Sequence, residues 1–578
     1  MKEHLGKIVL AVFSLCLIWG LIASEYVYKN KMEEKPIYFQ VGKEVIQAWK
    51  KEGVYYLFLP SYADKEEISL VSYSAKISLW ANGKDLTKDG KLREVLEEEA
   101  IQGQFLETGE KFDFCVLQSE NLQAIFIETK FGEVQDLKAD KELQVSGAIV
   151  CVDSEGNRTG KLGLKAIGGR GNTSFAGYEK KPFSITLEKE CELAGLPTGR
   201  KYALISNASD PSLVRNDLAR RMEVALNLPF SRTGQFVDLY INGEYEGNYY
   251  LCNEIEIGEQ QINIENMEAV MDLFYQKSGY EIEEIYENEA VKARKLEVFP
   301  TDITGGYLLE REYGERFRLE YETMGSGFVT DRKEHFAVKS PKYCSIEQIK
   351  YISDYVNQTE KAIVSKDGIN PDTQKSYEEY LKLDSFVKKY LVEEITKNYD
   401  AGVSSSYYYK DSDKNGGKLA AGPGWDYDMS LGNYVEWMED FSADPTGISE
   451  LEHHLYASDW YAKLCEKEKF GQAVKADYWE YVEPFLREML VSGLEEYQNM
   501  LENSSNMNHV RWEEELEKNI YYENRKQTFL ELKEFIAVRK YIQMELKRSG
   551  SREEYKYWEK RMRRLYKSYI PWIFKKSK

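Results

Sequence analysis

The pattern of apolar and polar positions first sets the N-terminus apart from the rest of the chain. Residues 8–23 form an almost unbroken apolar run of 16 residues, preceded by Lys2 and Lys7. Such a run is long for the apolar part of a signal peptide and short for a membrane-spanning helix. We expect residues 1–28 to form a membrane anchor or signal segment, with the remainder outside the cytoplasm. The alternative is a helix buried inside a domain.

From residue 37 to about residue 122 the pattern is typical of β-strands. "GVYYLFLPSYA" is an aromatic and β-branched run that ends near Pro60, and "SYSAKISLWANGKDL" alternates before a turn at Asn82 and Gly83. An Asn-Gly pair after an alternating segment is a strong hairpin signal. We therefore expect residues 36–122 to form a small β-sandwich module.

The central region, residues 123–440, mixes strand and helix patterns. "AIFIETKFGEV" alternates like a strand, and residues 236–255 predict a hairpin closed at Asn242 and Gly243. Residues 265–304 are acidic and show no period, so we expect an inserted loop there. An amphipathic helix running toward "TKNYD" is predicted by apolar residues at helical spacing. These residues are Leu383, Phe386, Val387, Tyr390, Leu391 and Ile395.

The C-terminal region, residues 441–578, is predicted to be helical and charged, which makes the whole chain an α+β protein. Its last stretch, residues 551–578, carries ten Lys and Arg residues against three Glu, with aromatic residues between them. Such a basic tail can lie on an anionic membrane surface, or it can be a solvated helix packed on its neighbours.

Composition narrows the possible functions. The chain has 578 residues, which is too long for a single core, so several domains are expected. Its net charge of −21 argues against nucleic acid as the main partner, because phosphate backbones bind basic surfaces. The six cysteines after Cys16 are scattered without a CxxC pair, and only five histidines are present, so a zinc site is not expected.

Two acidic stretches are candidates for chemistry. In "GPGWDYDMSLGN", Asp426 and Asp428 would share one face of a strand, where they repel each other unless a cation or a basic side chain lies between them. Such an oxygen site suits Mg²⁺, although the acids of a bent strand end can also accept backbone N–H groups. In "TKNYD", Asp400 follows the predicted helix and is placed to accept a proton from a hydroxyl, or to cap a turn.

A glycine-rich stretch, residues 168–187, is a candidate phosphate site. Three glycines surround Arg170 and expose backbone N–H groups that suit a phosphate, although most such loops are ordinary turns. Lys181 begins the following strand, from which a lysine can reach a nucleotide phosphate. Glu254 ends the aromatic strand of the predicted hairpin, where it can pair with a lysine in a cleft or remain a solvated acid.

Seven stretches in this order resemble the spore-coat protein H family of CotH-type kinases. They are "RGNTSF" with "KKPFSITL", "DPSLVRNDLARRM", "FVDLYINGEYEGNYYLCNEI", "GGYLLERE", "VKSP", "TKNYD" with "SSSYYYKD", and "GPGWDYDMSLGN". The resemblance covers about residues 123–433. It implies an atypical protein-kinase-like core that uses ATP with Mg²⁺ or Mn²⁺ to transfer the γ-phosphate to Ser residues.

The resemblance also implies roles for the matching residues. Asp400 would orient or deprotonate the acceptor hydroxyl, Asp426 would hold Mg²⁺, and Asp428 would be a second ligand or a structural support. Lys181 would contact the ATP phosphates with Glu254 orienting it, and Arg170, Gly171 and Asn172 would shape the phosphate loop. One position departs from the family, since Ser405 or Ser406 stands where family members often carry an Asn that completes the metal site.

Three functions are therefore compared. The first is an active kinase that phosphorylates Ser on secreted or cell-surface proteins. The second is a catalytically inactive, kinase-like surface or structural binding protein of the cell envelope, favoured by the absent Asn and the expected anchor. The third is a binder of cell-envelope carbohydrate or polymer, suggested by the aromatic-rich β-module. Metal-dependent nucleotide binding separates the first from the other two.

Overall fold

The computed structural model describes residues 36–82, 84–85, 96, 100–130, 134–278, 284–288, 291–294, 300–321, 323–402, 404–433, 445–446, 458–516, 525–548, 557 and 560. The expected anchor at residues 1–28 and nearly all of the basic tail at 551–578 lie outside the described residues. The chain divides into two compact units. The first comprises Met1–Glu128, Val152–Arg158 and Asp238–Glu246, and the second comprises Thr129–Cys151, Thr159–Val237 and Gly247–Lys578.

The first unit contains two sheets, which confirms the expected β-rich N-terminal region. A three-stranded sheet has the order β2-β1-β5, and a six-stranded sheet has the order β3-β4-β9-β8-β6-β7. Phe39 of β1 and Phe114 of β9 are buried with ring centroids 5.7 Å apart, so side chains of both sheets contribute to one apolar core. The strands are β1 (Tyr38–Val41), β2 (Glu44–Gln47), β3 (Trp49–Lys51), β4 (Val54–Leu59), β5 (Ser69–Leu70), β6 (Ile77–Ala81), β7 (Lys84–Asp85), β8 (Ile101–Phe105) and β9 (Lys111–Gln118).

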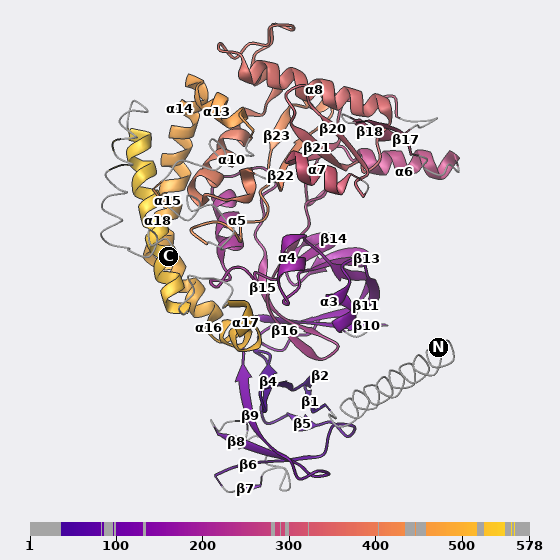
Figure 1. The fold of residues 1–578 in the computed structure, drawn as a ribbon, viewed down its shortest axis with the longest axis vertical. Helices are drawn as coiled ribbons and strands as arrows, with labels where there is room; N and C mark the ends of the chain where they lie inside the picture. The colour runs from indigo at the N-terminus through magenta and orange to yellow at the C-terminus, as the bar shows by residue number, and fades with distance from the viewer. Residues whose placement is uncertain are drawn as a thin grey trace, which may run out of the picture. The chain divides into compact units, whose positions relative to one another are not determined.

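A closed barrel follows, with the strand order β10-β11-β12-β13-β14-β16-β15 (Figure 1). Its elements are β10 (Gln123–Thr129), α3 (Val134–Ala139), β11 (Gln144–Val152), β12 (Leu162–Gly169), α4 (Thr173–Gly177), β13 (Phe183–Leu193), β14 (Leu196–Ile205), α5 (Arg215–Ala225), β15 (Gln235–Ile241) and β16 (Glu244–Asn253). The predicted hairpin turn is confirmed, since Asn242 and Gly243 have φ of 51° and 87°. Both angles are positive, as the tightest hairpin turns require.

The second unit also holds a seven-stranded sheet with the order β17-β18-β20-β21-β19-β22-β23. Its strands are β17 (Glu284–Asn288), β18 (Val291–Arg294), β19 (Tyr307–Glu312), β20 (Ser326–Val329), β21 (His335–Ser340), β22 (Ser406–Lys410) and β23 (Leu419–Ala421). Helices α7 (Gly314–Glu320) and α8 (Ile346–Val364) accompany it, and α8 packs on β18 and β20 (Figure 1).

The prediction of an inserted loop at residues 265–304 is wrong. The segment contains helix α6 (Met267–Ser278), the edge strand β17 and its neighbour β18. Met267 and Met271 of α6 are buried, and β18 pairs with β20 through Val291 and Phe328. A few apolar contacts are therefore enough to order this largely acidic segment against the sheet. Because strand pairing depends on residues far away in the sequence, it leaves no clear periodicity of apolar positions within the segment.

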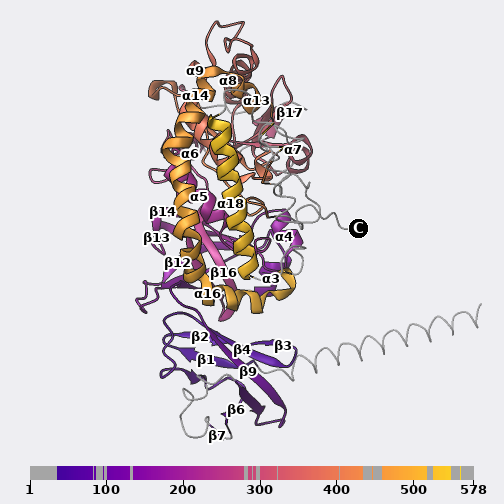
Figure 2. The same cartoon turned by 90° about the vertical axis from the view of Figure 1, so that its left-hand side faces the viewer.

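The amphipathic helix predicted before "TKNYD" is confirmed as α10 (Leu383–Thr396), and helices dominate the C-terminal region as expected. They include α13 (Trp460–Cys465), α14 (Glu468–Asp477), α15 (Glu483–Glu488), α16 (Leu494–Arg511), α17 (Glu513–Leu516) and α18 (Arg525–Arg548). Helix α18 runs beside α16 (Figure 2), and it also contacts α15 and α10. Across the described ranges, no helix combines the length and the apolar character needed to cross a membrane.

Candidate functional site

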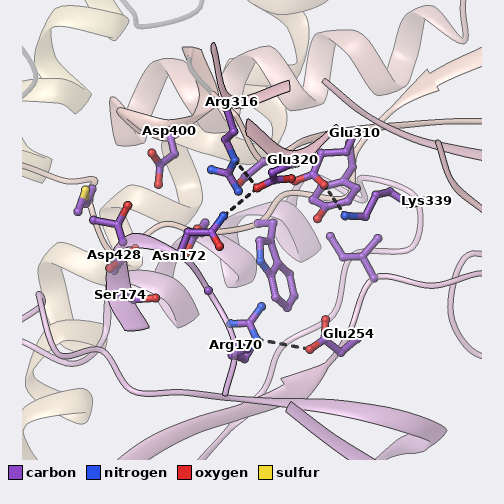
Figure 3. Close-up of a pocket in the computed structure, with 18 of the residues that line it drawn as sticks. Arg170, Asn172, Ser174, Glu254, Glu310, Arg316, Glu320, Lys339, Asp400 and Asp428 are labelled. Carbon is purple, nitrogen blue, oxygen red and sulfur yellow. Dashed lines mark hydrogen bonds and ion pairs between the residues drawn. The ribbon is translucent and has the colours of Figure 1, made fainter. Parts of the chain in front are cut away.

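A cavity of about 420 Å³ lies within the second unit (Figure 3). Its lining comes from the glycine-rich loop after β12, the end of β16, strands β19, β21 and β22, helix α7, and the loops that carry Asp400 and Asp426. The main charged or polar lining residues are Lys141, Arg170, Asn172, Glu254, Glu310, Arg316, Glu320, Lys339, Asp400, Asp426 and Asp428. Segments far apart in sequence therefore place both acids and bases around one cavity.

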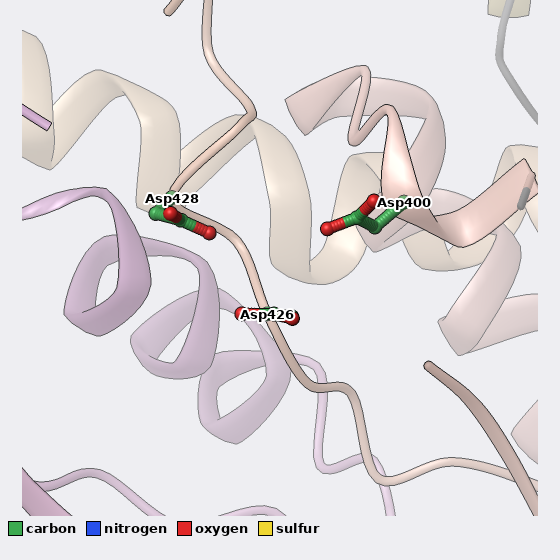
Figure 4. Close-up of side chains that lie close together, drawn as sticks. All are labelled: Asp400, Asp426 and Asp428. Atoms are coloured by element: carbon green, nitrogen blue, oxygen red, sulfur yellow. The ribbon is translucent and has the colours of Figure 1, made fainter. Parts of the chain in front are cut away.

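Three aspartates meet at one side of this cavity (Figure 4). Asp400, Asp426 and Asp428 each offer a carboxylate oxygen, and these oxygens all lie within 4.8 Å of one another. Ligands on opposite sides of a Mg²⁺ ion are separated by about 4.2 Å, given Mg–O distances of 2.0–2.1 Å. The bound of 4.8 Å is slightly longer than this separation, so a small inward movement of the side chains would let this all-oxygen donor set hold a divalent cation such as Mg²⁺ or Mn²⁺.

Local backbone geometry brings Asp400 to this cluster. Helix α10 ends in a left-handed residue, Lys397 at φ 48°, which turns the chain into the short 3₁₀ segment η1 (Asp400–Gly402). Two backbone hydrogen bonds join the chain just before η1 to the loop of the other two acids. Tyr399 N donates to Met429 O over 3.2 Å, and Leu431 N donates to Thr396 O over 2.7 Å.

The prediction that Asp426 and Asp428 lie on a strand is wrong, although the prediction that their side chains point to the same side is confirmed. The segment lies in an irregular loop after β23, and Asp426 has a left-handed φ of 64°. This loop packs closely, because a Cβ on Gly424 would lie 1.8 Å from Glu223 Oε1 and 1.9 Å from the Tyr427 hydroxyl. The shared direction of the two acids therefore comes from an anchored turn, not from strand alternation.

Tyr427 is the anchor of this turn. Its fully buried hydroxyl contacts Glu223 Oε1 at 2.6 Å and Glu393 Oε1 at 3.0 Å, and Lys389 Nζ lies 3.3 Å from the same hydroxyl. Its backbone N–H donates to Asn216 Oδ1 over 2.8 Å. Side chains of α5 and α10 thus hold the residue that separates the two aspartates.

Asp428 is also held by Ser209 of a second loop and by Asn433 of its own loop. The Ser209 hydroxyl donates to Asp428 Oδ2, and Asn433 Nδ2 donates to both Ser209 O at 2.9 Å and Asp428 O at 2.7 Å. No sequence pattern predicted a role for Ser209 or Asn433. Both lie within or beside stretches that carry the family resemblance, but only the fold shows that they meet.

The electrostatics of the three acids indicate a site suited to positive charge. Burial, and then repulsion from Asp426 and Asp428, raises the pKa of Asp400 well above its ordinary value, while Arg316 acts in the opposite direction. Burial also raises the pKa of Asp426, opposed by Arg170 and Arg316. Burial and the neighbouring Asp426 raise the pKa of Asp428 to about 7. A divalent cation would remove this mutual repulsion.

The glycine-rich loop lies at the same cavity. Arg170, Gly171 and Asn172 all line it, as the resemblance implies. Gly171 has φ 72°, and a Cβ there would lie 2.2 Å from Ser174 Oγ, so this position requires glycine. Arg170 lies over the Trp425 ring, 5.1 Å from its centroid, which connects the loop to the residue next to Asp426.

Lys181 and Glu254, which the resemblance implies would work together, have different partners in the structure. Lys181 Nζ donates to Phe175 O over 2.8 Å, and Lys181 is not among the described residues that line the cavity. Glu254 does line it, but its carboxylate lies 3.4 Å from Arg170 Nε and accepts a hydrogen bond from Ser184 Oγ over 3.0 Å. Glu254 therefore pairs with an arginine of the glycine-rich loop.

Several charged residues of the cavity were missed by the sequence analysis. Lys339 Nζ forms an ion pair with Glu310 Oε2 at 2.8 Å, and Arg316 forms ion pairs with Glu312 and Glu320, each at 3.1 Å. Lys339 and Glu310 occur in "VKSP" and "GGYLLERE", which carried the resemblance without an assigned role. Arg316 lies in no quoted stretch, so the sequence offered no signal for it.

The serines at the position of the absent Asn differ in their surroundings. Ser405 lines the cavity, whereas the Ser406 hydroxyl donates to Ala401 O over 2.9 Å. Ser404 accepts a hydrogen bond from Arg316 Nη1 over 2.9 Å. Of the two serines considered from the sequence, Ser405 is therefore the one that faces the site.

Comparison with known proteins gives one family. Residues 167–543, well over half of the chain, match the family described as CotH kinase protein. No curated protein matches the sequence. The matched range begins before the glycine-rich loop and ends within α18, so it contains the three aspartates and most of the cavity.

Proposed function

The chain belongs to the CotH kinase family, and on this premise we propose that it is an atypical protein kinase that transfers the γ-phosphate of ATP to a Ser hydroxyl. The observation that carries the proposal is the cluster of Asp400, Asp426 and Asp428 in one cavity with Arg170, Arg316 and Lys339. Phosphoryl transfer depends mainly on positioning and on neutralising charge, and this cavity offers residues for both. A kinase-like core is part of the proposal.

The metal would be held by Asp426 and Asp428, with Asp400 at its edge. A bound Mg²⁺ or Mn²⁺ supplies charge neutralisation at the transferring phosphate. Tyr427 and Ser209 keep the two ligands directed into the cavity, so that little reorganisation is needed when the cation binds.

Asp400 would orient the acceptor hydroxyl and take its proton. In the transfer, the acceptor oxygen forms a bond to the γ-phosphorus, the bond from that phosphorus to the ADP oxygen breaks, and the hydroxyl proton passes to the Asp400 carboxylate. Arg316 favours the ionised form that this role requires, since it opposes the raised pKa of Asp400. Arg170, Gly171 and Asn172 would face the ATP phosphates.

The partner we propose is a secreted or cell-surface protein, and the location is extracytoplasmic with attachment to the membrane. This part of the proposal rests on the apolar run at residues 8–23. The basic stretch at residues 551–578 is a second candidate for contact with an anionic membrane surface.

A catalytically inactive, kinase-like binding protein is the second candidate. The observation that favours it is that Arg170, Arg316 and Lys339 each face a carboxylate of the protein, where a nucleotide would need free positive charge. Ser405 in place of an Asn also favours it, because a neutral hydroxyl is a different metal ligand from an amide carbonyl.

The experiment is transfer of label from γ-labelled ATP by the full chain with Mg²⁺ or Mn²⁺, to the protein itself or to a generic protein acceptor. Asp426→Ala is compared with Asp354→Ala, an exposed aspartate of α8. Metal-dependent labelling that is lost only in Asp426→Ala supports the kinase. No labelling, together with no ATP-dependent rise in melting temperature, supports the binding protein.

A further inference from the structure

Arg316 lies between two carboxylates that differ in accessibility. Its Nε is 3.1 Å from Glu312 Oε2 and 3.1 Å from Glu320 Oε1. The Glu312 side chain is 1% exposed and the Glu320 side chain is 30% exposed. Glu312 can therefore remain the permanent partner of the guanidinium, while Glu320 can leave toward solvent.

Glu320 is also held from the opposite side of the cavity (Figure 3). Asn172 Nδ2, in the glycine-rich loop, donates to Glu320 Oε1 over 2.8 Å, and Lys141 Nζ donates to Asn172 Oδ1 over 2.6 Å. One carboxylate oxygen thus accepts hydrogen bonds from an arginine of α7 and from an amide of the glycine-rich loop. All four residues line the cavity.

The donors that hold Glu320 are those that bind a phosphate oxygen. Arginine N–H groups and amide N–H groups donate equally well to carboxylate and phosphate oxygens, and arginine is the usual choice for phosphate. Arg316 also lies near the metal site, because it lines the same cavity as the three aspartates and its Nη1 donates to Ser404 Oγ over 2.9 Å. An anion in the place of the Glu320 carboxylate would therefore sit beside the three aspartates.

The other ion pairs of the cavity are less easily exchanged. Lys339 pairs with Glu310, whose side chain is only 6% exposed within β19. Glu320 is the last residue of α7, so its side chain can rotate outward without moving a strand. If a phosphate replaces the Glu320 carboxylate, Arg316 still has a negatively charged partner.

We propose that Arg316 and Asn172 form a phosphate subsite of the nucleotide pocket and that the Glu320 carboxylate fills this subsite until a nucleotide displaces it. The inference rests on the proposed function, since it assumes that the cavity binds ATP. Glu320 then lowers the apparent affinity for ATP, because only the fraction of molecules with the side chain swung out can bind.

The test measures dissociation constants for ATP with Mg²⁺ by calorimetry, on the full chain and on Glu320→Ala. If Glu320 fills the subsite about nine-tenths of the time, its removal lowers the Kd for ATP about tenfold. Glu315→Ala changes an exposed glutamate of the same helix and leaves the Kd unchanged. Adenosine, which has no phosphate, gains nothing from Glu320→Ala.

The outcomes separate this inference from the proposed function. Equal or weaker ATP binding by Glu320→Ala than by the parent overturns the inference while leaving a nucleotide site in place. An equal gain for adenosine overturns it too, because the cavity would then have opened without a phosphate subsite. Failure of both the parent and Glu320→Ala to bind ATP overturns the inference together with the proposed function.

Discussion

The hydroxyl of Tyr427 donates a hydrogen bond to Glu223 Oε1 over 2.6 Å, and this contact fixes the residue that separates Asp426 from Asp428. Glu223 belongs to α5 and is 1% exposed, so the bond is made in the interior. The loop that carries both aspartates is thus held from its buried side by a residue that does not itself line the cavity.

Tyr427→Phe is the first test of this relationship. The change removes the donor to two buried carboxylates, Glu223 and Glu393, and we expect it to cost roughly 1–3 kcal/mol of unfolding free energy. It should also weaken Mn²⁺ binding, because the aspartates on either side lose their anchor. Urea unfolding and Mn²⁺ titration measure the two effects. Tyr73→Phe, at an exposed tyrosine, should change neither, and an unaltered Mn²⁺ affinity in Tyr427→Phe would rule out the anchor.

Lys181 tests the role that the family resemblance implies for it. Because its ammonium donates to Phe175 O and lies 5.1 Å from the centroid of the Phe175 ring, we expect Lys181→Met to lower stability by roughly 1–3 kcal/mol. The Kd for ATP, measured by calorimetry below the unfolding range, should stay the same. Lys189→Met, at an exposed lysine of β13, is the control. A large loss of ATP affinity in Lys181→Met would restore the role implied by the resemblance.

Glu360 of α8 should make stability depend on pH. It is 1% exposed, and Trp460 Nε1 donates to its Oε1 over 3.0 Å. Burial raises its pKa from 4.5 to about 7, with hydrogen bonds from Thr330 and Trp460 acting in the opposite direction. A carboxyl with a higher pKa in the folded state stabilises that state while protonated, so its contribution is lost as the pH rises from about 4.5 to about 7.

Glu360→Gln should remove this pH dependence, because the glutamine stays neutral. The change in unfolding free energy that it removes is up to about 3 kcal/mol. Urea unfolding at a series of pH values measures it, with Glu347→Gln, an exposed position of α8, as the control. Parallel pH profiles for the parent and Glu360→Gln would contradict the assignment.

Arg539 connects the C-terminal helical region to the helix that leads into the site. Its guanidinium lies 3.0 Å from Glu394 Oε1 of α10, and both side chains are fully buried. We expect Arg539→Ala to destabilise the protein by roughly 3–5 kcal/mol, because it leaves the buried carboxyl group of Glu394 without this partner. Lys533→Ala, on the exposed side of α18, should have little effect. Thermal unfolding compares the two, and similar melting temperatures would contradict the expectation.

The sequence predicted local features better than distant contacts. The hairpin turn at Asn242 and Gly243 and helix α10 were predictable because turn chemistry and helical spacing are local signals. The segment at residues 265–304 was not, since its order depends on pairing with β20. Asp426 and Asp428 were expected on a strand. Instead, the left-handed backbone of Asp426 and the buried Tyr427 hydroxyl direct both carboxylates to the same side.

The candidate site shows the same division. Motif order pointed to Asp400, Asp426 and Asp428, which the fold does bring within 4.8 Å of one another. Arg316 and its pairing with Glu320 could not be foreseen, because α7 reaches the cavity only through the arrangement of the sheet. The ion pair of Glu254 with Arg170 could not be predicted either, because it forms only where the end of β16 lies next to the glycine-rich loop.

Binding of Mn²⁺ is the most direct test of the central claim that Asp426 and Asp428, beside Asp400, hold a divalent cation. Electron paramagnetic resonance would follow free Mn²⁺ during titration of the full chain, of Asp426→Asn and of Asp354→Asn. We expect the parent and Asp354→Asn to bind Mn²⁺ alike, and Asp426→Asn to lose most of the affinity, because one carboxylate ligand becomes a neutral amide. Equal binding by all three proteins, or no binding by the parent with ATP present, would contradict the claim.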